Sequence, residues 1–153
     1  MENSIIVVCL DYDFACKVAQ DICSLTGKFY LDSEQLMQYE IPNKEEIIEN
    51  CGYEYFKKQE DKFIRNLADY ENTIITLKYE MFSVDEHYLI FKNFPCYYLF
   101  ISENDKNFNI IEKISYKDRH NLLVKYCKYT IDCSCENSVQ IANQIISRSN
   151  CES

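Results

Sequence analysis

The stretch SIIVVCLDYDFACK at residues 4–17 decides the fold. Residues 4–10 form an apolar run rich in β-branched side chains, which is typical of a buried parallel strand. Apolar residues then recur at three- and four-residue spacing, which predicts a helix over residues 14–25. A strand, a loop and a helix in this order often cradle a phosphate on the bare backbone of glycines. This stretch has no glycine and carries two carboxylates, Asp11 and Asp13. The sequence therefore predicts the architecture of a phosphate-binding fold without the cradle.

The rest of the chain predicts helices that alternate with strands. Further strands are expected at residues 28–31, 73–77, 95–102 and 129–133. Helical patterns cover residues 33–38, 44–50, 53–67 and 83–93, one or two short helices cover 107–128, and a C-terminal helix begins with 139–146. Gly27 is a predicted C-cap, Asn43 a predicted N-cap, and Ser83 opens a predicted capping box. Strands separated by helices indicate an α/β fold with a parallel sheet covered on both faces, in a single domain over residues 1–153.

The amino-acid composition argues against two classes of function, nucleic-acid binding and membrane association. The chain has 153 residues, 47% of them hydrophobic, and a formal net charge of −9. Acidity and the lack of a basic cluster argue against nucleic acid as a partner. The apolar run near the N-terminus is far shorter than the ~20 residues of a membrane span, and no leader pattern precedes it, so we expect no membrane association and a cytoplasmic location.

The cysteines and histidines do not predict a metal site. Nine cysteines are an odd number, and several fall at core-like positions, so we expect reduced, buried thiols. Cys133 and Cys135 are separated by one residue, which is unlike the spacing of a zinc-binding pair. His87 and His120 are the only histidines in the sequence. We therefore expect no metal.

Several local patterns, taken in order, resemble the shikimate kinase family over nearly the whole chain. The matching segments are YLDSE (30–34), YFKKQE (55–60), IITLKYE (74–80), CYYL (96–99), RHNLL (119–123), YTID (129–132) and ANQII (142–146). They resemble, in turn, the family's aromatic/apolar-Asp-x-Asp motif, its Phe-Arg-x-x-Glu helix, the strand entering its triple-glycine turn, the strand before its lid, and its C-terminal third. The resemblance implies a three-layer P-loop kinase fold, with a five-stranded parallel sheet in the order 2-3-1-4-5.

The same resemblance argues against the family's nucleotide site. Without a gap, the family's loop glycines fall at Cys9, Tyr12 and Phe14. Its phosphate-binding lysine falls at Ala15 and its magnesium-binding hydroxyl at Cys16. An alignment that uses Lys17 as the lysine needs a gap, still lacks glycines and puts Val18 at the hydroxyl position. The segment corresponding to the lid is also short, and it has no arginine before Arg119. Phosphoryl transfer depends on all these devices.

Positions that would contact the acceptor survive in altered form. The resemblance implies a role near the metal for Asp32, a contact with acceptor hydroxyls for Glu34, and carboxylate binding by Arg119. Lys57 replaces an arginine and offers only a point charge. Lys78-Tyr79-Glu80 replaces the glycine turn, so we expect these side chains to occupy the acceptor site. Two interpretations stay open: a residual small-acid pocket of Glu34, Lys57 and Arg119, or surface charges and ion pairs on an inherited scaffold.

The sequence therefore favours a non-catalytic, shikimate kinase-like protein that needs no cofactor. It would serve as a binding or interaction module, with a small carboxylate ligand or a protein as its partner; an exposed cluster of tyrosines would mark a protein interface. The alternative is a shikimate kinase or related small-molecule kinase of aromatic amino-acid biosynthesis, which transfers phosphate from ATP with Mg²⁺ to a hydroxyl acceptor.

Overall fold

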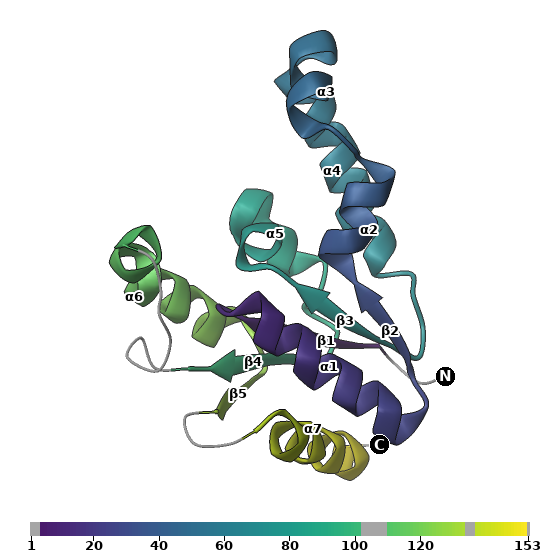
Figure 1. The fold of residues 1–153 in the computed structure, drawn as a ribbon, viewed down its shortest axis with the longest axis vertical. Helices are drawn as coiled ribbons and strands as arrows, with labels where there is room; N and C mark the ends of the chain where they lie inside the picture. The colour runs from purple at the N-terminus through teal and green to yellow at the C-terminus, as the bar shows by residue number, and fades with distance from the viewer. Residues whose placement is uncertain (1–3, 102–109, 134–136, 153) are drawn as a thin grey trace.

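The computed structural model describes residues 4–101, 110–133 and 137–152, without the side chains of 82–86, 110–115 and 151–152. Helices and strands alternate along the chain (Figure 1). The elements are β1 (Ile5–Cys9), α1 (Tyr12–Thr26), β2 (Phe29–Asp32), α2 (Ser33–Glu40), α3 (Lys44–Cys51), α4 (Tyr53–Leu67), β3 (Thr73–Leu77), α5 (Tyr79–Ser83), the 3₁₀ helix η1 (Val84–Leu89), β4 (Cys96–Phe100), α6 (Ile110–Tyr126), β5 (Tyr129–Asp132) and α7 (Ser138–Glu152).

The strands form one five-stranded parallel sheet in the order β2-β3-β1-β4-β5. Strand β1 is central, and Ile6 lies opposite Ile75 of β3 and Cys96 of β4. All residues of β1 and β3 are buried, whereas the edge strand β2 is partly exposed. The fold class, the parallel sheet and the strand order predicted from the sequence are confirmed.

Two hydrophobic cores cover the two faces of this sheet. Successive side chains of a strand point to opposite faces, so Ile5, Val7 and Cys9 pack with α1 and α7. Ile6 and Val8 pack with α4, α6 and the segment after β3. Helices α1 and α7 lie together on one side (Figure 1). Each fully buried aliphatic side chain contributes roughly 1.5–3 kcal/mol, so burial on both faces stabilises this sheet.

Local signals at helix ends were partly correct. Gly27 ends α1 in the left-handed conformation (φ +77°), and its N–H donates to the Cys23 carbonyl at 2.8 Å, which confirms the predicted C-cap. Asn43 is the N-cap residue of α3, at the predicted position, but its side chain makes no capping hydrogen bond. Its φ of +55° is left-handed, whereas a capping side chain works from an extended backbone.

The segment after β3 also differs from the prediction. A helix was expected to open at Ser83, but Ser83 ends the short helix α5 and the 3₁₀ helix η1 follows it. The predicted helical region 107–128 contains one helix, α6, whereas 107–109 lie outside the described residues. None of the helices in the described part of the chain combines the length and apolar character required to cross a bilayer. The cysteines whose side chains are described are free thiols; Cys9, Cys96, Cys127 and Cys133 are buried as expected, whereas Cys16 and Cys23 are half-buried and Cys51 is exposed.

Candidate functional site

The connection between β1 and α1 is only two residues long. Strand β1 ends at Cys9 and helix α1 begins at Tyr12, so Leu10 and Asp11 alone join them. The predicted strand over 4–10 and helix over 14–25 left residues 11–13 as the connection, so the observed connection is one residue shorter than expected. Helix α1 begins at Tyr12, two residues before the start that its apolar pattern indicated, because the Asp11 side chain caps it there.

Asp11 is that cap. Its backbone is extended (φ −95°, ψ 97°), and its carboxylate accepts a hydrogen bond from the Phe14 N–H at 3.2 Å. Its carbonyl accepts from the Ala15 N–H at 3.2 Å. Positive φ values among the described residues occur at Gly27, Asn43, Gly52 and Asn72. The junction thus contains none of the left-handed conformations that glycines supply to a phosphate-binding loop, and a carboxylate already binds the start of the helix.

Tyr12 extends from the first turn of α1 across the carboxyl ends of the neighbouring strands. Its hydroxyl donates to Asp32 Oδ1 at the end of β2 and lies 2.9 Å from Thr76 Oγ1 of β3. Burial, followed by the hydrogen bond to Asp32, raises the pKa of Tyr12 well above its usual value, so the hydroxyl stays protonated. Sequence reasoning missed the roles of Tyr12 and Thr76 in this bridge. The only signal was a bulky polar residue at a position where the related loop has glycine.

The remaining residues of the junction add no positive charge to this bridge. Ala15 is fully buried in the core, and Lys17 lies on the exposed side of α1. Cys16 Sγ lies 3.8 Å from Asp32 Oδ2 and 3.9 Å from Thr76 Oγ1. Burial is the main cause that raises the pKa of the Cys16 thiol, so this group is neutral at physiological pH.

Asp32 is engaged on its other side by helix α2. It is the N-cap of that helix, and its Oδ1 accepts from the N–H groups of Glu34 at 3.0 Å and Gln35 at 3.2 Å. The same oxygen accepts from Tyr12. The next residue, Ser33, is buried and donates to the Thr76 carbonyl at 2.5 Å. Asp32 therefore joins α1, α2 and β3 into one hydrogen-bonded unit.

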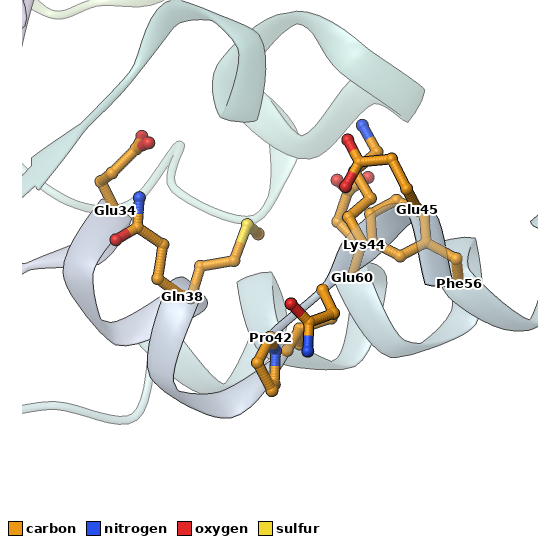
Figure 2. A pocket seen from close by; sticks show the side chains of 10 residues that line it. Glu34, Gln38, Pro42, Lys44, Glu45, Phe56 and Glu60 are labelled. Atoms are coloured by element: carbon orange, nitrogen blue, oxygen red, sulfur yellow. The ribbon is translucent and has the colours of Figure 1, made fainter. Parts of the chain in front are cut away.

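A groove opens beside this unit, between α2 and the α3–α4 pair. It consists of two adjoining cavities of about 450 and about 420 Å³. Both are lined by Glu34, Met37, Lys44, Phe56 and Glu60. The first cavity adds Gln38, Ile41, Pro42, Asn43 and Glu45, and the second adds Tyr53, Lys57, Lys78, Glu80 and Met81. Figure 2 shows the first cavity, with Glu34 and Gln38 on one side and Lys44, Glu45 and Glu60 on the other. We call these two cavities together the α2–α4 groove.

The groove brings together some of the residues that the sequence singled out. Glu34 and Lys57 line the same cavity, from α2 and α4. Arg119 of α6 lines neither cavity, but its Nη1 lies 3.3 Å from Oε1 of Glu80, which does line the groove. The structure thus brings Glu34 and Lys57 together in one cavity, whereas Arg119 is linked to that cavity only through its contact with Glu80.

Ion pairs within the chain match most of the charges in the groove. Lys78 Nζ lies 2.9 Å from Glu34 Oε2, and Lys57 Nζ lies 2.9 Å from Glu60 Oε1. Lys78 and Glu80, two of the residues in place of the family's glycine turn, form part of the wall of this open groove. Sequence reasoning missed these partners because contacts between distant elements leave no local pattern.

Other candidates form no second site in the described residues. The Tyr98 hydroxyl pairs with His120 Nδ1 at 2.8 Å, and buried His87 has Nε2 3.4 Å from Asp61 Oδ1. Cys133 is buried, and Cys135 lies outside the described residues. Among the side chains that the structure describes, no group of three or more His, Cys, Asp or Glu could hold a metal ion.

Comparison with known proteins finds likeness in structure only. No protein-family profile and no curated protein sequence matches this chain. The shikimate kinase of Acinetobacter baumannii, solved in complex with shikimate, superposes with a TM-score of 0.73 at 16% identity, covering 99% of this chain and 95% of that one. The shikimate kinase of Aquifex aeolicus gives 0.76 at 15% identity, covering 97% of each chain. That of Bacteroides thetaiotaomicron gives 0.70 at 10% identity, covering 95% of this chain and 98% of that one. The chain therefore has a shikimate kinase-like fold.

Proposed function

We propose that this chain is a non-catalytic, shikimate kinase-like binding module that neither binds ATP·Mg nor transfers its phosphate. The observation that supports this most strongly is the bridge at the β1–α1 junction. Tyr12 fills the space between Asp32 and Thr76, and the Asp11 carboxylate holds the first turn of α1. In a P-loop kinase this is where the nucleotide's phosphates and their metal would lie.

The residues at the junction do not fit a phosphate or Mg²⁺. A bound phosphate needs free N–H groups at the helix start and a nearby cation. Here Asp11 takes that place with negative charge, Ala15 offers no cation, and Lys17 is exposed. Mg²⁺ prefers hard oxygen ligands, whereas Cys16 offers a neutral thiol. Loss of one preorganised contact commonly lowers a rate by ~10²–10³, so loss of several leaves no measurable turnover.

The open groove supports a binding role. Its volume lies in the range of small-molecule sites, and its lining combines apolar side chains with a few charged ones. A small carboxylate-bearing molecule or a side chain of a partner protein would fit such a groove. This part of the proposal does not depend on the nucleotide side.

A second candidate function is a shikimate kinase-type phosphotransferase with ATP and Mg²⁺. The observation that favours it is that Glu34 and Lys57 line one open cavity, with Arg119 paired to Glu80 of the same lining. One of the structural neighbours is solved with shikimate bound.

A coupled kinase assay separates the two functions. Purified protein is given ATP·Mg and shikimate, with a bacterial shikimate kinase as positive control and the Lys17→Ala variant as matched control. We expect no ADP release above background from wild type or variant. Turnover by the wild type that Lys17→Ala abolishes would favour the kinase.

A further inference from the structure

The charges that line the α2–α4 groove decide which ligands it accepts. Four carboxylates and three ammonium groups line it: Glu34, Glu45, Glu60, Glu80, Lys44, Lys57 and Lys78. Lys78 and Lys57 pair with Glu34 and Glu60, and Glu80 pairs with Arg119. A simple anion that enters must break one of these pairs or leave a carboxylate facing it. The groove therefore differs from a site built to hold an organic acid.

Two groove charges are left over, one of each sign. Within the described residues, neither Lys44 nor Glu45 forms an ion pair. They are consecutive at the start of α3, and both line the cavity of about 450 Å³ (Figure 2). Lys44 Nζ lies 5.0 Å from the centroid of the Phe56 ring, so an aromatic face holds this ammonium group at the groove.

Part of the wall of this cavity is apolar. Met37, Ile41, Pro42 and the buried Phe56 line the same cavity. Apolar surface buried there would contribute roughly 25 cal/mol per Å², whereas a ligand with polar groups along its body would lose hydrogen bonds to water. The lining thus matches a molecule with an apolar body and one charged group of each sign.

We propose that the α2–α4 groove binds a small zwitterion with an apolar body, of the chemical class of free α-amino acids. Its carboxylate pairs with Lys44 and its ammonium group with Glu45, while the apolar body packs against Met37 and Phe56. This inference rests on the proposed binding function and names the ligand class of that groove. A pure anion would face Glu34, Glu45 and Glu60, and a pure cation would leave Lys44 unmatched, so the zwitterion is preferred over both.

Three probes of matched size test the preference. Leucine, 4-methylpentanoate and 3-methylbutylamine share one branched body and differ only in which charges they carry. Each is titrated up to the solubility of leucine into ¹⁵N-labelled protein, and amide shifts are followed by NMR. We expect saturable shifts with leucine at residues of α2, α3 and α4, and about fivefold weaker binding of each analogue, because each loses one partly exposed ion pair.

Single substitutions test which groove residue pairs with each charged group of the ligand. Lys44→Met removes the partner of the leucine carboxylate, so leucine should bind this variant about fivefold more weakly and no better than 3-methylbutylamine does. Glu45→Gln removes the partner of the ammonium group, so leucine should bind this variant no better than 4-methylpentanoate does. Lys58→Met is the matched control, because Lys58 is exposed on the neighbouring α4 and lines neither cavity; it should leave all three affinities unchanged.

Failure of this inference is distinct from failure of the proposed function. Equal affinity of wild type for leucine and either analogue, or no saturable shift with any probe, would overturn the zwitterion. The absence of nucleotide binding would still stand in that case. Nucleotide binding, measured separately, would overturn the non-catalytic function whatever the three probes do.

Discussion

The β1–α1 junction and the α2–α4 groove adjoin, but side chains fill the space at the junction and leave the groove open. Lys78 lies between them, with Nζ 5.5 Å from the centroid of the Tyr12 ring and 2.9 Å from Glu34 Oε2. On the junction side, hydrogen bonds among Tyr12, Asp32 and Thr76 close the space. On the groove side, ion pairs line a cavity of about 420 Å³ that stays open. The difference teaches that hydrogen bonds can close the space at one junction while ion pairs a short distance away line a groove that stays open.

The first prediction compares a tyrosine from each region. Tyr12→Ala removes a half-buried ring together with two hydrogen bonds, and it leaves Asp32 and Thr76 without that partner. We expect the free energy of unfolding to fall by roughly 3 kcal/mol. Tyr53→Ala removes a ring that is 59% exposed at the groove, and it should cost about 0.5 kcal/mol or less. Urea unfolding of both variants measures the contrast, and equal losses would remove the distinction between the regions.

The second prediction isolates the Tyr12 hydroxyl. Tyr12→Phe keeps the ring and deletes the bonds to Asp32 and Thr76, so we expect a loss of about 1–2 kcal/mol. Asp32 keeps its two backbone donors from α2, which limits the loss. Tyr55→Phe is the control, because Tyr55 is 47% exposed. If Tyr12→Phe is as neutral as Tyr55→Phe in urea unfolding, the hydroxyl does not close the junction.

The sequence predicted the scaffold well because the scaffold is built from local patterns. The apolar runs at Ile5–Cys9 and Thr73–Leu77 can satisfy their burial only inside a covered sheet. The helix Tyr53–Leu67 was predicted with the bounds that the structure has, because its apolar face is continuous. The strand order came from the resemblance to a family, and the parallel pairing agrees with it.

The candidate site was only partly predictable. The start of α1 at Tyr12 depends on the Asp11 cap, which outweighs the apolar pattern that begins at Phe14. The bridge from Tyr12 to Thr76 and the pair Glu34–Lys78 join residues far apart in sequence. Such contacts follow from the packing of whole helices and strands, and no residue spacing in the sequence predicts them.

The third prediction concerns alkaline pH and the helix that closes the junction. Burial raises the pKa of the Cys23 thiol of α1 from 9.0 to about 11, and it raises the pKa of Cys16 as well. The folded state thus favours the neutral thiols. Their contribution is fully present below pH 9, near the unfolded pKa, and is lost as the pH rises towards about 11. Because Cys23 is only half-buried, we expect a loss of about 1 kcal/mol or less.

Urea midpoints measured from neutral to alkaline pH test this loss. Cys23→Ala should flatten the alkaline decline, whereas Cys51→Ala, which changes an exposed thiol at the end of α3, should leave it unchanged. An identical decline in both variants would show that the thiol of Cys23 does not contribute.

The fourth prediction addresses the groove's ion pairs. Glu34→Gln breaks the pair with Lys78, whose side chains are 29% and 38% exposed, so the cost should be only about 0.2–1 kcal/mol and should shrink in high salt. Glu45→Gln is the control, because Glu45 forms no ion pair within the described residues. A loss as large as that of Tyr12→Ala, insensitive to salt, would show that the groove is closed by its charges in the same way as the junction.

Nucleotide binding should have the smallest effect of all, and it tests the central claim most directly. A ligand present at 100 times its dissociation constant stabilises a protein by about 2.7 kcal/mol. If Asp11 and Tyr12 occupy the place of the phosphates, as we propose, millimolar ATP·Mg should leave the thermal midpoint unchanged and give no binding heat by calorimetry. A saturable heat with micromolar affinity, lost in Lys17→Ala, would contradict this account.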